Sequence, residues 1–141
     1  GYESGQWISY YDGGELDEIG ESINGLKDGK WGRFHVGGSL KQEETYKLGK
    51  LIEVSDFYLS DGNVFKNETF DNGNGELLDY YEDGNIFSIA KYKNGLLNGM
   101  YSEYHTNGKI SQSGMYKNGE KSGTWNEYNR RGREIKRKTY D

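Results

Sequence analysis

The residue types that most often carry acid–base chemistry or hold metal ions are scarce in this sequence. Histidine, the usual proton-transfer group near neutral pH, occurs only at His35 and His105. The two occupy the same place in copies of the internal repeat that are three repeats apart, as described below, so we expect them to lie far from each other. A shared metal ion or a catalytic pair is therefore not predicted, and each is most simply a histidine on the surface of a strand. Cysteine is absent, which excludes disulfides and thiolate zinc sites.

Two glycine-rich segments have a distant likeness to ligand-binding loops. Residues 25–30 lack the spacing and the Ser or Thr of a phosphate loop, and residues 71–76 are too short for a calcium loop of about twelve residues. Both are better interpreted as turns. Acidic residues are abundant, but none recurs as an inward-facing pair, and Glu43 and Glu44 are interpreted as solvated charges at a sheet edge. The sequence therefore predicts a protein with no enzymatic activity, no cofactor and no metal site.

The composition is typical of many short strands joined by tight turns. Of 141 residues, 22 are Gly, 13 are Tyr and none is Pro. Only 32% are hydrophobic, against about 45–50% by a broader count in compact domains, so a thick central core is not expected. The aromatic content of 15% argues against a disordered chain. No apolar run approaches the roughly 20 residues of a membrane-spanning helix.

An internal repeat of roughly 24 residues explains most of the sequence. Six repeats begin at residues 5, 29, 53, 75, 99 and 123, and the first residue of each is numbered position zero. Position nine is Gly in all six repeats, and position twenty is Gly in the five repeats that reach it. Position five is always aromatic: Tyr10, Phe34, Tyr58, Tyr80, Tyr104 and Tyr128. Position eleven is aliphatic in five repeats: Leu16, Leu40, Val64, Ile86 and Ile110.

Each repeat is predicted to form one β-hairpin. Asp-Gly or Asn-Gly pairs occur at position nine, as in Asp83-Gly84, and at position twenty, as in Asn94-Gly95. Both residue types tolerate the positive φ of a type I′ turn, so we expect two alternating turns of this kind. The strands should cover about positions two to seven and ten to eighteen, and consecutive hairpins should pair into one long, twisted, single-layer antiparallel sheet. Repeat three has Glu53 at position zero and a short closing loop; we interpret it as a bend, with a linker between subdomains as the alternative.

Residues 92–110 and 116–128 resemble the bacterial MORN-variant repeat. The family pattern is Tyr-x-x-Gly-x-x-x-Gly-x-Trp-x-x-Tyr-x-x-x-Gly-x-Ile/Leu, and it fits repeats four to six closely, one and two well, and three poorly. The resemblance covers nearly the whole chain and implies a single-layer, elongated sheet of hairpins. It also implies a role in partner binding, because many bacterial proteins of this kind are described as antitoxins of toxin–antitoxin pairs and others as exported lipoproteins. It transfers no catalytic or toxin-contacting residue.

The two faces of the predicted sheet should differ. Side chains alternate between faces along a strand, so position five lies opposite positions two and six. We expect positions five and eleven to form the packed stripe and positions two and six to expose a ladder of aromatic and His side chains for a protein partner. An alternative for position two is stacking with a purely structural role. The predicted partner-binding residues are Trp7, Tyr11, Trp31, His35, Tyr81, Tyr101, His105 and Trp125.

Charge is distributed unevenly along the chain. Residues 1–98 hold 9 basic and 18 acidic residues, and residues 99–141 hold 9 basic and 5 acidic residues. A basic patch is predicted near the C-terminal end: Arg130, Arg131, Arg133, Lys136, Arg137 and Lys138. It is either a solvated capping strand or a site for an acidic partner, which could include anionic lipid headgroups as weak ligands. The net charge of −5 disfavours nucleic acid.

Two functions follow from these observations. The first is a scaffold that binds a protein partner, either a toxin or a surface protein. The second is a structural or envelope-associated repeat protein that associates with itself. The compartment stays open: an antitoxin would be cytoplasmic, whereas a leader removed before Gly1 would place the chain in the periplasm or at the cell surface.

Overall fold

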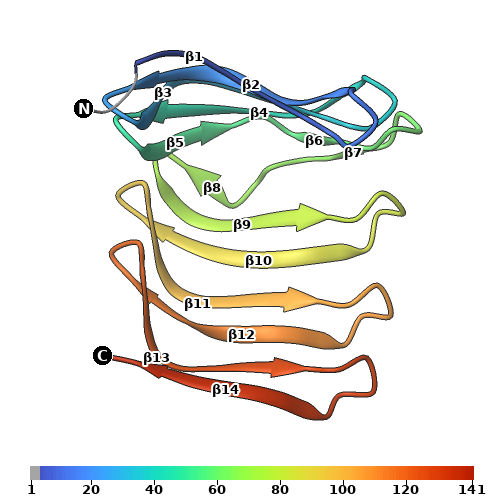
Figure 1. Cartoon of the computed structure of the whole chain (residues 1–141), viewed down its shortest axis with the longest axis vertical. Coiled ribbons are helices and arrows are strands. Elements are labelled where there is room, and N and C mark those ends of the chain that lie inside the picture. The colour runs from blue at the N-terminus through green and yellow to red at the C-terminus, as the bar shows by residue number, and fades with distance from the viewer. Residues whose placement is uncertain (1–3) are drawn as a thin grey trace. The chain divides into compact units, whose positions relative to one another are not determined.

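Consecutive antiparallel hairpins make up residues 4–141, the part of the chain described by the computed structural model (Figure 1). A five-stranded sheet contains β1 (Gly5–Tyr10), β2 (Leu16–Ile23), β3 (Leu26–Phe34), β4 (Leu40–Lys47) and β5 (Lys50–Val54). A two-stranded sheet contains β6 (Phe57–Tyr58) and β7 (Val64–Phe65). A seven-stranded sheet contains β8 (Phe70–Asp71), β9 (Asn74–Tyr80), β10 (Ile86–Lys93), β11 (Leu96–Tyr104), β12 (Ile110–Lys117), β13 (Glu120–Tyr128) and β14 (Glu134–Tyr140). The predicted all-β class and the hairpin series are confirmed, although the strands form three sheets instead of one.

The two turns of each repeat differ in type. At position twenty both central residues have positive φ, as in Asn94 (52°) and Gly95 (82°), which confirms the predicted type I′ turn. At position nine only the glycine has positive φ, as in Gly84 (89°), whose N–H donates to the Tyr81 carbonyl at 2.9 Å. The Tyr81 N–H in turn donates to the Asn85 carbonyl at 2.8 Å. This is a three-residue loop with a left-handed glycine, so the type I′ prediction for position nine is wrong.

Repeat three is where the sheet is interrupted. β5 ends at Val54, and the next residue, Ser55, binds β4 through polar groups instead of continuing the strand. Gln42 donates its side-chain N–H to the Ser55 carbonyl at 3.1 Å, and the Glu43 N–H donates to the Ser55 hydroxyl at 2.9 Å. After the end of β5, repeat three contributes only the short strands β6, β7 and β8. The strand therefore ends before Ser55, a small polar residue at position two, where the other repeats have a large side chain.

The chain divides into two compact parts, the N-terminal module (up to Gly73) and the C-terminal module (Asn74–Asp141). In both, the best-buried side chains lie on the face of positions two and six, which we call the aromatic face. Trp31 and His35 are 2% exposed and Trp125 is 4% exposed. On the opposite face, position five is only partly covered and Tyr10 is 61% exposed. The prediction that positions five and eleven form the packed stripe is therefore wrong, and the packed face is the other one.

Candidate functional site

Position two on the aromatic face carries the two buried tryptophans, and each lies flat over a glycine of the preceding repeat. A Cβ built on Gly20 would lie 2.0 Å from the Trp31 ring, and one built on Gly114 would lie 2.2 Å from the Trp125 ring. The Trp31 indole N–H donates to the Glu21 carbonyl at 2.9 Å. The indole is therefore held by both packing and a hydrogen bond, and the neighbouring strand must offer a bare backbone for it to rest on.

A lysine covers each of these indoles from the other side. Lys27 places its Nζ 4.5 Å from the centroid of the Trp31 ring, and Lys121 places its Nζ at the same distance from Trp125. Both lysines are at position 22 of the preceding repeat, and each also approaches the tyrosine at position seventeen, at 4.9 Å for Tyr46. This arrangement allows cation–π attraction in addition to contact with the apolar stem of the lysine.

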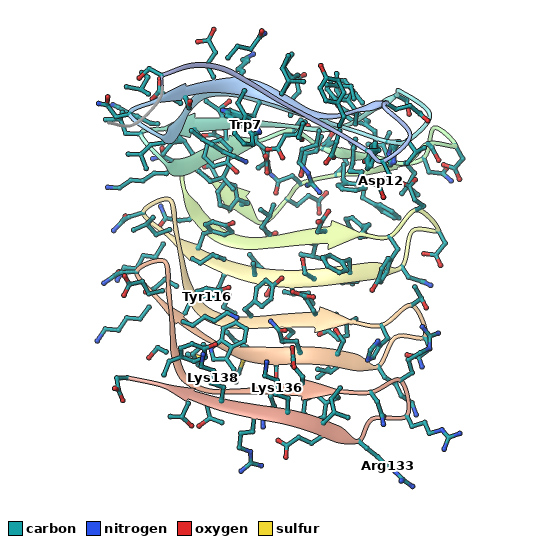
Figure 2. The ribbon with its side chains drawn as sticks, in the orientation of Figure 1. Trp7, Asp12, Tyr116, Arg133, Lys136 and Lys138 are labelled. Atoms are coloured by element: carbon teal, nitrogen blue, oxygen red, sulfur yellow. The ribbon has the colours of Figure 1, made fainter. Side chains whose placement is uncertain are left out.

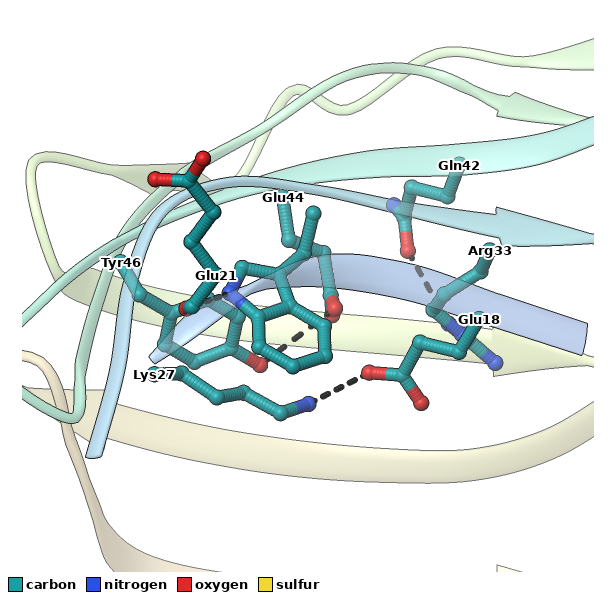
Figure 3. A network of polar contacts seen from close by, with 8 residues as sticks. Glu18, Glu21, Lys27, Arg33, Gln42, Glu44 and Tyr46 are labelled. Atoms are coloured by element: carbon teal, nitrogen blue, oxygen red, sulfur yellow. Dashed lines mark hydrogen bonds and ion pairs between the residues drawn. The ribbon is translucent and has the colours of Figure 1, made fainter. Parts of the chain in front are cut away.

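In the N-terminal module the charges around the indole satisfy one another. We define the N-terminal tryptophan site as Glu18, Lys27, Trp31, Arg33, Gln42, Glu44 and Tyr46 (Figure 3). Lys27 pairs with Glu18 at 2.6 Å, and Arg33 donates to the Gln42 side-chain oxygen at 3.3 Å. Every cation of this site therefore has a polar or acidic neighbour within it.

Glu44 is the buried acid of this site. It is 8% exposed and accepts a hydrogen bond from the Tyr46 hydroxyl at 3.4 Å. Burial raises the pKa of the Glu44 carboxyl, although Arg33 and Lys27 act in the opposite direction. Glu44 was interpreted from the sequence as a solvated edge charge, and that interpretation is wrong. Together these contacts make the N-terminal tryptophan site internally neutralised.

The equivalent positions of the C-terminal module carry different charges. We define the C-terminal tryptophan site as Gln112, Lys121, Trp125, Glu127, Lys136, Lys138 and Tyr140, which line a hollow of about 100 Å³. Position fifteen is Lys138 here but Glu44 in the first site, and position four is Glu127 here but Arg33 there. Gln112 takes the place of Glu18, so the acid that pairs with Lys27 has no counterpart.

The balance of this second site is positive. Three lysines against one glutamate give a formal charge of 3 − 1 = +2. Within residues 4–141, neither Lys121, Lys136 nor Lys138 forms a salt bridge. Lys138 places its Nζ 5.0 Å from the centroid of the Tyr140 ring. Figure 2 shows Lys136 and Lys138 side by side on β14. Glu127 lies directly across from Lys136 on the neighbouring strand, so the site offers a surplus of two lysines beside an aromatic surface.

Tyrosines continue the aromatic face from this site. Tyr101 packs against Trp125 with ring centroids 5.8 Å apart, and Tyr116 does so at 5.0 Å. The Tyr101 hydroxyl donates to Glu103 at 2.7 Å. Burial, together with this bond to Glu103, raises the pKa of Tyr101 well above its ordinary value, so the phenol stays protonated.

Position six forms a ladder of hydrogen bonds between repeats. The Tyr81 hydroxyl donates to the Tyr104 carbonyl at 2.6 Å, and His105 contacts the Tyr128 carbonyl through Nε2 at 2.8 Å. In the N-terminal module, the hydroxyl of Tyr11 donates to the Phe34 carbonyl and the His35 ring contacts the Tyr58 carbonyl in the same way. Each bond joins position six of one repeat to the backbone at position five of the next.

These contacts decide which predicted binding residues can reach a partner. Trp7 is 54% exposed, as predicted. Trp31, His35 and Trp125 were predicted to be exposed, and that prediction is wrong. The two tryptophans are buried against a glycine of the preceding repeat, and His35 is buried in its contact with the Tyr58 carbonyl of the next repeat. The surface-histidine interpretation is likewise wrong for His35. The remaining residues, Tyr11, Tyr81, Tyr101 and His105, are half-buried in the same contacts. Their partner-binding role stays a prediction.

The six residues of the predicted basic patch are divided among three settings. Arg130, Arg131 and Arg133 lie in the turn before β14, where the Arg130 guanidinium donates to the Thr106 hydroxyl at 3.1 Å. Arg137 pairs with Glu134 at 3.1 Å, and hydrogen bonds from Asn126 and Arg137 lower the pKa of that carboxyl. Lys136 and Lys138 belong to the C-terminal tryptophan site. The turn and the tryptophan site are therefore separate cationic features.

The sequence contained a signal for the tryptophan sites that the repeat columns alone do not show. In four of the five joins, position fifteen and position two of the following repeat vary inversely in size: Gly20 precedes Trp31, Ala90 precedes Tyr101, Gly114 precedes Trp125 and Glu44 precedes Ser55. The exception is the irregular third repeat, where Glu68 precedes Leu77. Ala90 and Tyr101 are direct cross-strand partners. Comparing the two positions would have predicted which side chains lie flat on a neighbouring strand.

Among residues 4–141, no group of three or more His, Cys, Asp or Glu side chains is arranged to hold a metal ion. The described part of the chain also contains no helix long and apolar enough to cross a membrane.

Comparison with known proteins gives one family match. The model of the MORN repeat variant matches residues 73–94 and 97–118, two adjacent repeats of the C-terminal module that together make up less than half of the chain. No curated protein matches the sequence at a significant level. The two matched segments end at Asn94 and Asn118, the first central residue of a type I′ turn in each case, so the limits of the match fall at these turns.

Proposed function

We propose that this protein is a non-enzymatic repeat scaffold that binds an acidic segment of a protein partner at the C-terminal tryptophan site. The observation that carries the proposal is the contrast between two sites built on one frame. The N-terminal site pairs Lys27 with Glu18 at 2.6 Å, whereas Lys121 has the neutral Gln112 at the equivalent position. A carboxylate from outside would complete the second site as Glu18 completes the first.

The size and charge of the site favour a side-chain carboxylate as the ligand group. The hollow of about 100 Å³ is well below the roughly 300–1,000 Å³ of pockets for small-molecule ligands. A glutamate or aspartate side chain is small enough, and its two oxygens can accept hydrogen bonds from two lysines. Tyr140 and the neighbouring Tyr116 supply broad aromatic contact for the rest of the partner.

A toxin neutralised by this scaffold is one partner of the required chemistry, provided that it presents an acidic surface. The support for it is the resemblance of the repeats to proteins described as antitoxins, together with the match of two repeats to the MORN repeat variant. An envelope-associated protein that assembles with itself is the second candidate, and the complementary ends of the chain described in the next subsection favour it.

Titration calorimetry with an oligoglutamate peptide tests the proposed site. We expect Lys121→Gln and Lys138→Gln to weaken binding by about tenfold or more each at low salt, since a charge-assisted hydrogen bond contributes about 1.5–3 kcal/mol. Lys27→Gln is the matched control, because Lys27 has the same place over its indole but is already paired with Glu18. Equal weakening by Lys27→Gln and Lys121→Gln, or no binding of the peptide, would contradict the proposal.

A further inference from the structure

The strands β1 and β14 are of the two types that pair with each other between successive repeats. Among residues 4–141, β1 pairs only with β2 and β14 pairs only with β13, so each has an unpaired edge. Within the chain, the second strand of one repeat pairs with the first strand of the next, as β2 does with β3 and β12 with β13. β14 is the second strand of repeat six and β1 is the first strand of repeat one.

We propose that β14 of one copy pairs antiparallel with β1 of a second copy, so that the repeat continues head to tail from one molecule to the next. The internal joints fix the register. In β12–β13, Gln112 is opposite Glu127 and Ser113 is opposite Asn126. The same positions at the joint between copies set Lys136 opposite Ser9 and Arg137 opposite Ile8. Addition of a strand to an exposed edge is an established mode of recognition, in which main-chain hydrogen bonds supply the affinity.

Charge complementarity in the turns supports a second copy as the occupant. Between repeats five and six, the turn at position nine contacts the next such turn: Asn107 donates to the Arg130 carbonyl at 2.9 Å, and Arg130 donates to Thr106 at 3.1 Å. The equivalent contacts at the joint bring Arg131 and the other turn arginines against the turn that begins at Asp12. Figure 2 labels Arg133 and Asp12 in these two turns.

The charges of the two turns are opposite. Repeat six contributes Arg130, Arg131 and Arg133, and repeat one contributes Asp12 and Glu15. All five side chains are exposed in the single chain. A basic turn on another basic turn, or an acidic turn on another acidic turn, would be repulsive, so the charges select a head-to-tail joint over a symmetric one.

Two side chains at the ends lack a contact that their internal equivalents make. Trp7 is 54% exposed, while Trp31 and Trp125 at the same position lie against a preceding repeat. At the joint, position fifteen is Lys138 instead of a glycine, so Trp7 would not lie flat on the strand as Trp31 and Trp125 do, and its contact would be with the lysine side chain as a cation–π partner. Asn129, at position six, uses its side-chain oxygen for the backbone N–H groups of Arg131 and Arg133. Among residues 4–141 its amide N–H groups have no hydrogen-bond acceptor, and at the joint they would donate to the Tyr10 carbonyl and continue the ladder.

The joint goes beyond the proposed partner site, because its main-chain pairing uses the free edge of β14 and its charge contacts use the turn before β14. The joint and the partner site share Lys136 and Lys138, whereas Lys121 belongs to the partner site alone. Such a joint does not close on itself by twofold symmetry; it gives rings or open filaments. An interface of one strand and one turn is small, so we expect reversible association in the micromolar range or weaker.

Sedimentation velocity over a range of protein concentrations tests the joint. We expect the average mass of the wild-type chain to rise above 16.1 kDa with concentration and to fall again when salt screens the turn charges. The tail variant Arg131→Asp/Arg133→Asp and the head variant Asp12→Arg/Glu15→Arg should each lower the association constant by about tenfold or more, because like charges then meet. An equimolar mixture of the two should associate again.

The control is Lys93→Glu/Lys117→Glu, which reverses two exposed lysines away from either edge. It should associate like the wild type, and circular dichroism should show all variants folded. A wild-type chain that stays monomeric at every concentration would overturn the proposal, as would variants that associate unchanged or a mixture that fails to recover. Peptide binding separates this result from the proposed function, since Lys121→Gln should affect the peptide and leave the association intact.

Discussion

The contact between Gly20 and Trp31 makes a sharp prediction, since one methyl group should displace a buried indole. The Cβ of Gly20→Ala would lie 2.0 Å, 2.3 Å and 2.4 Å from three atoms of the ring. An ordinary carbon–carbon contact is about 3.5–4.0 Å, so the ring must move by about 1.5 Å or more. Lys27 lies over the opposite side of the ring, with its Nζ 4.5 Å from the centroid, and hinders that movement.

The expected cost can be estimated from three contributions. Overpacking of a filled site costs about 1–3 kcal/mol. Weakening the bond from the indole to the Glu21 carbonyl, now 2.9 Å, adds about 0.5–1.5 kcal/mol. The reduced freedom of the unfolded chain returns about 0.4–1 kcal/mol when Gly becomes Ala. The net loss of unfolding free energy is about 2 kcal/mol, or roughly 8–16 °C in the melting temperature of a module of this size.

Thermal melts of three variants test this estimate. Gly20→Ala and Gly114→Ala should both lower the melting temperature of the module that contains them. Gly37→Ala is the matched control, because a Cβ there meets nothing within 4 Å and the backbone φ is not in the left-handed region. If Gly20→Ala melts at the same temperature as Gly37→Ala, the indole does not rest on the glycine and the account of the aromatic face fails.

Three further perturbations follow from single residues. Gly108→Val should lower the unfolding free energy by about 1–2 kcal/mol in chemical denaturation, because valine is strained at the φ of +86° that Gly108 adopts. A Cβ at this position would meet no atom within 4 Å, so the cost comes from the backbone alone. Equal stability of Gly108→Val and Gly37→Val would contradict this. Glu44→Gln should stabilise the protein more near neutral pH than in acid. The pKa of Glu44 is raised in the folded state, so the wild type loses stability as the pH rises above the ordinary carboxyl value of 4.5, and glutamine removes that loss. A difference in melting temperature between variant and wild type that does not change with pH would reject this explanation. Tyr81→Phe should cost about 0.5–1.5 kcal/mol by removing the bond to the Tyr104 carbonyl at 2.6 Å, and an unchanged melting temperature would show that the ladder contributes nothing.

The glycine columns were enough to predict the hairpin series, because a left-handed backbone leaves a direct mark on residue choice. All six position-nine glycines have positive φ, from 86° at Gly108 to 94° at Gly38 and Gly62. The type of the position-nine turn was not predictable from the Asp-Gly or Asn-Gly pair alone. The residue before that glycine keeps an ordinary φ there, whereas Asn94, Asn118 and their equivalents at position twenty do not. The same dipeptide suits both loops, and the strand register decides between them.

The choice of packed face could not be made from alternation. Both faces of the first strand carry large side chains. The alternation of side chains along a strand therefore shows which positions share a face, but it does not show which face is buried. What decides it is contact between repeats: Trp31 needs the bare backbone of Gly20, and His35 needs the Tyr58 carbonyl. Such contacts join residues of different repeats, and a column-by-column comparison of equivalent positions does not display them.

The two tryptophan sites show how a repeat array can separate stability from recognition. The elements that hold the indole are the same in both: a glycine below, a lysine above and a backbone carbonyl for the N–H. Positions four and fifteen of the tryptophan's own repeat flank this frame, and their charges differ between the two sites. They differ in opposite directions, with Arg33 and Glu44 in one site and Glu127 and Lys138 in the other. A site whose charges cancel internally gains little from an outside ion, because a partner would have to displace the existing pair. A site with surplus lysines gains from a carboxylate that reaches it. Under the proposed function, these few positions are what would distinguish a binding repeat from a structural one.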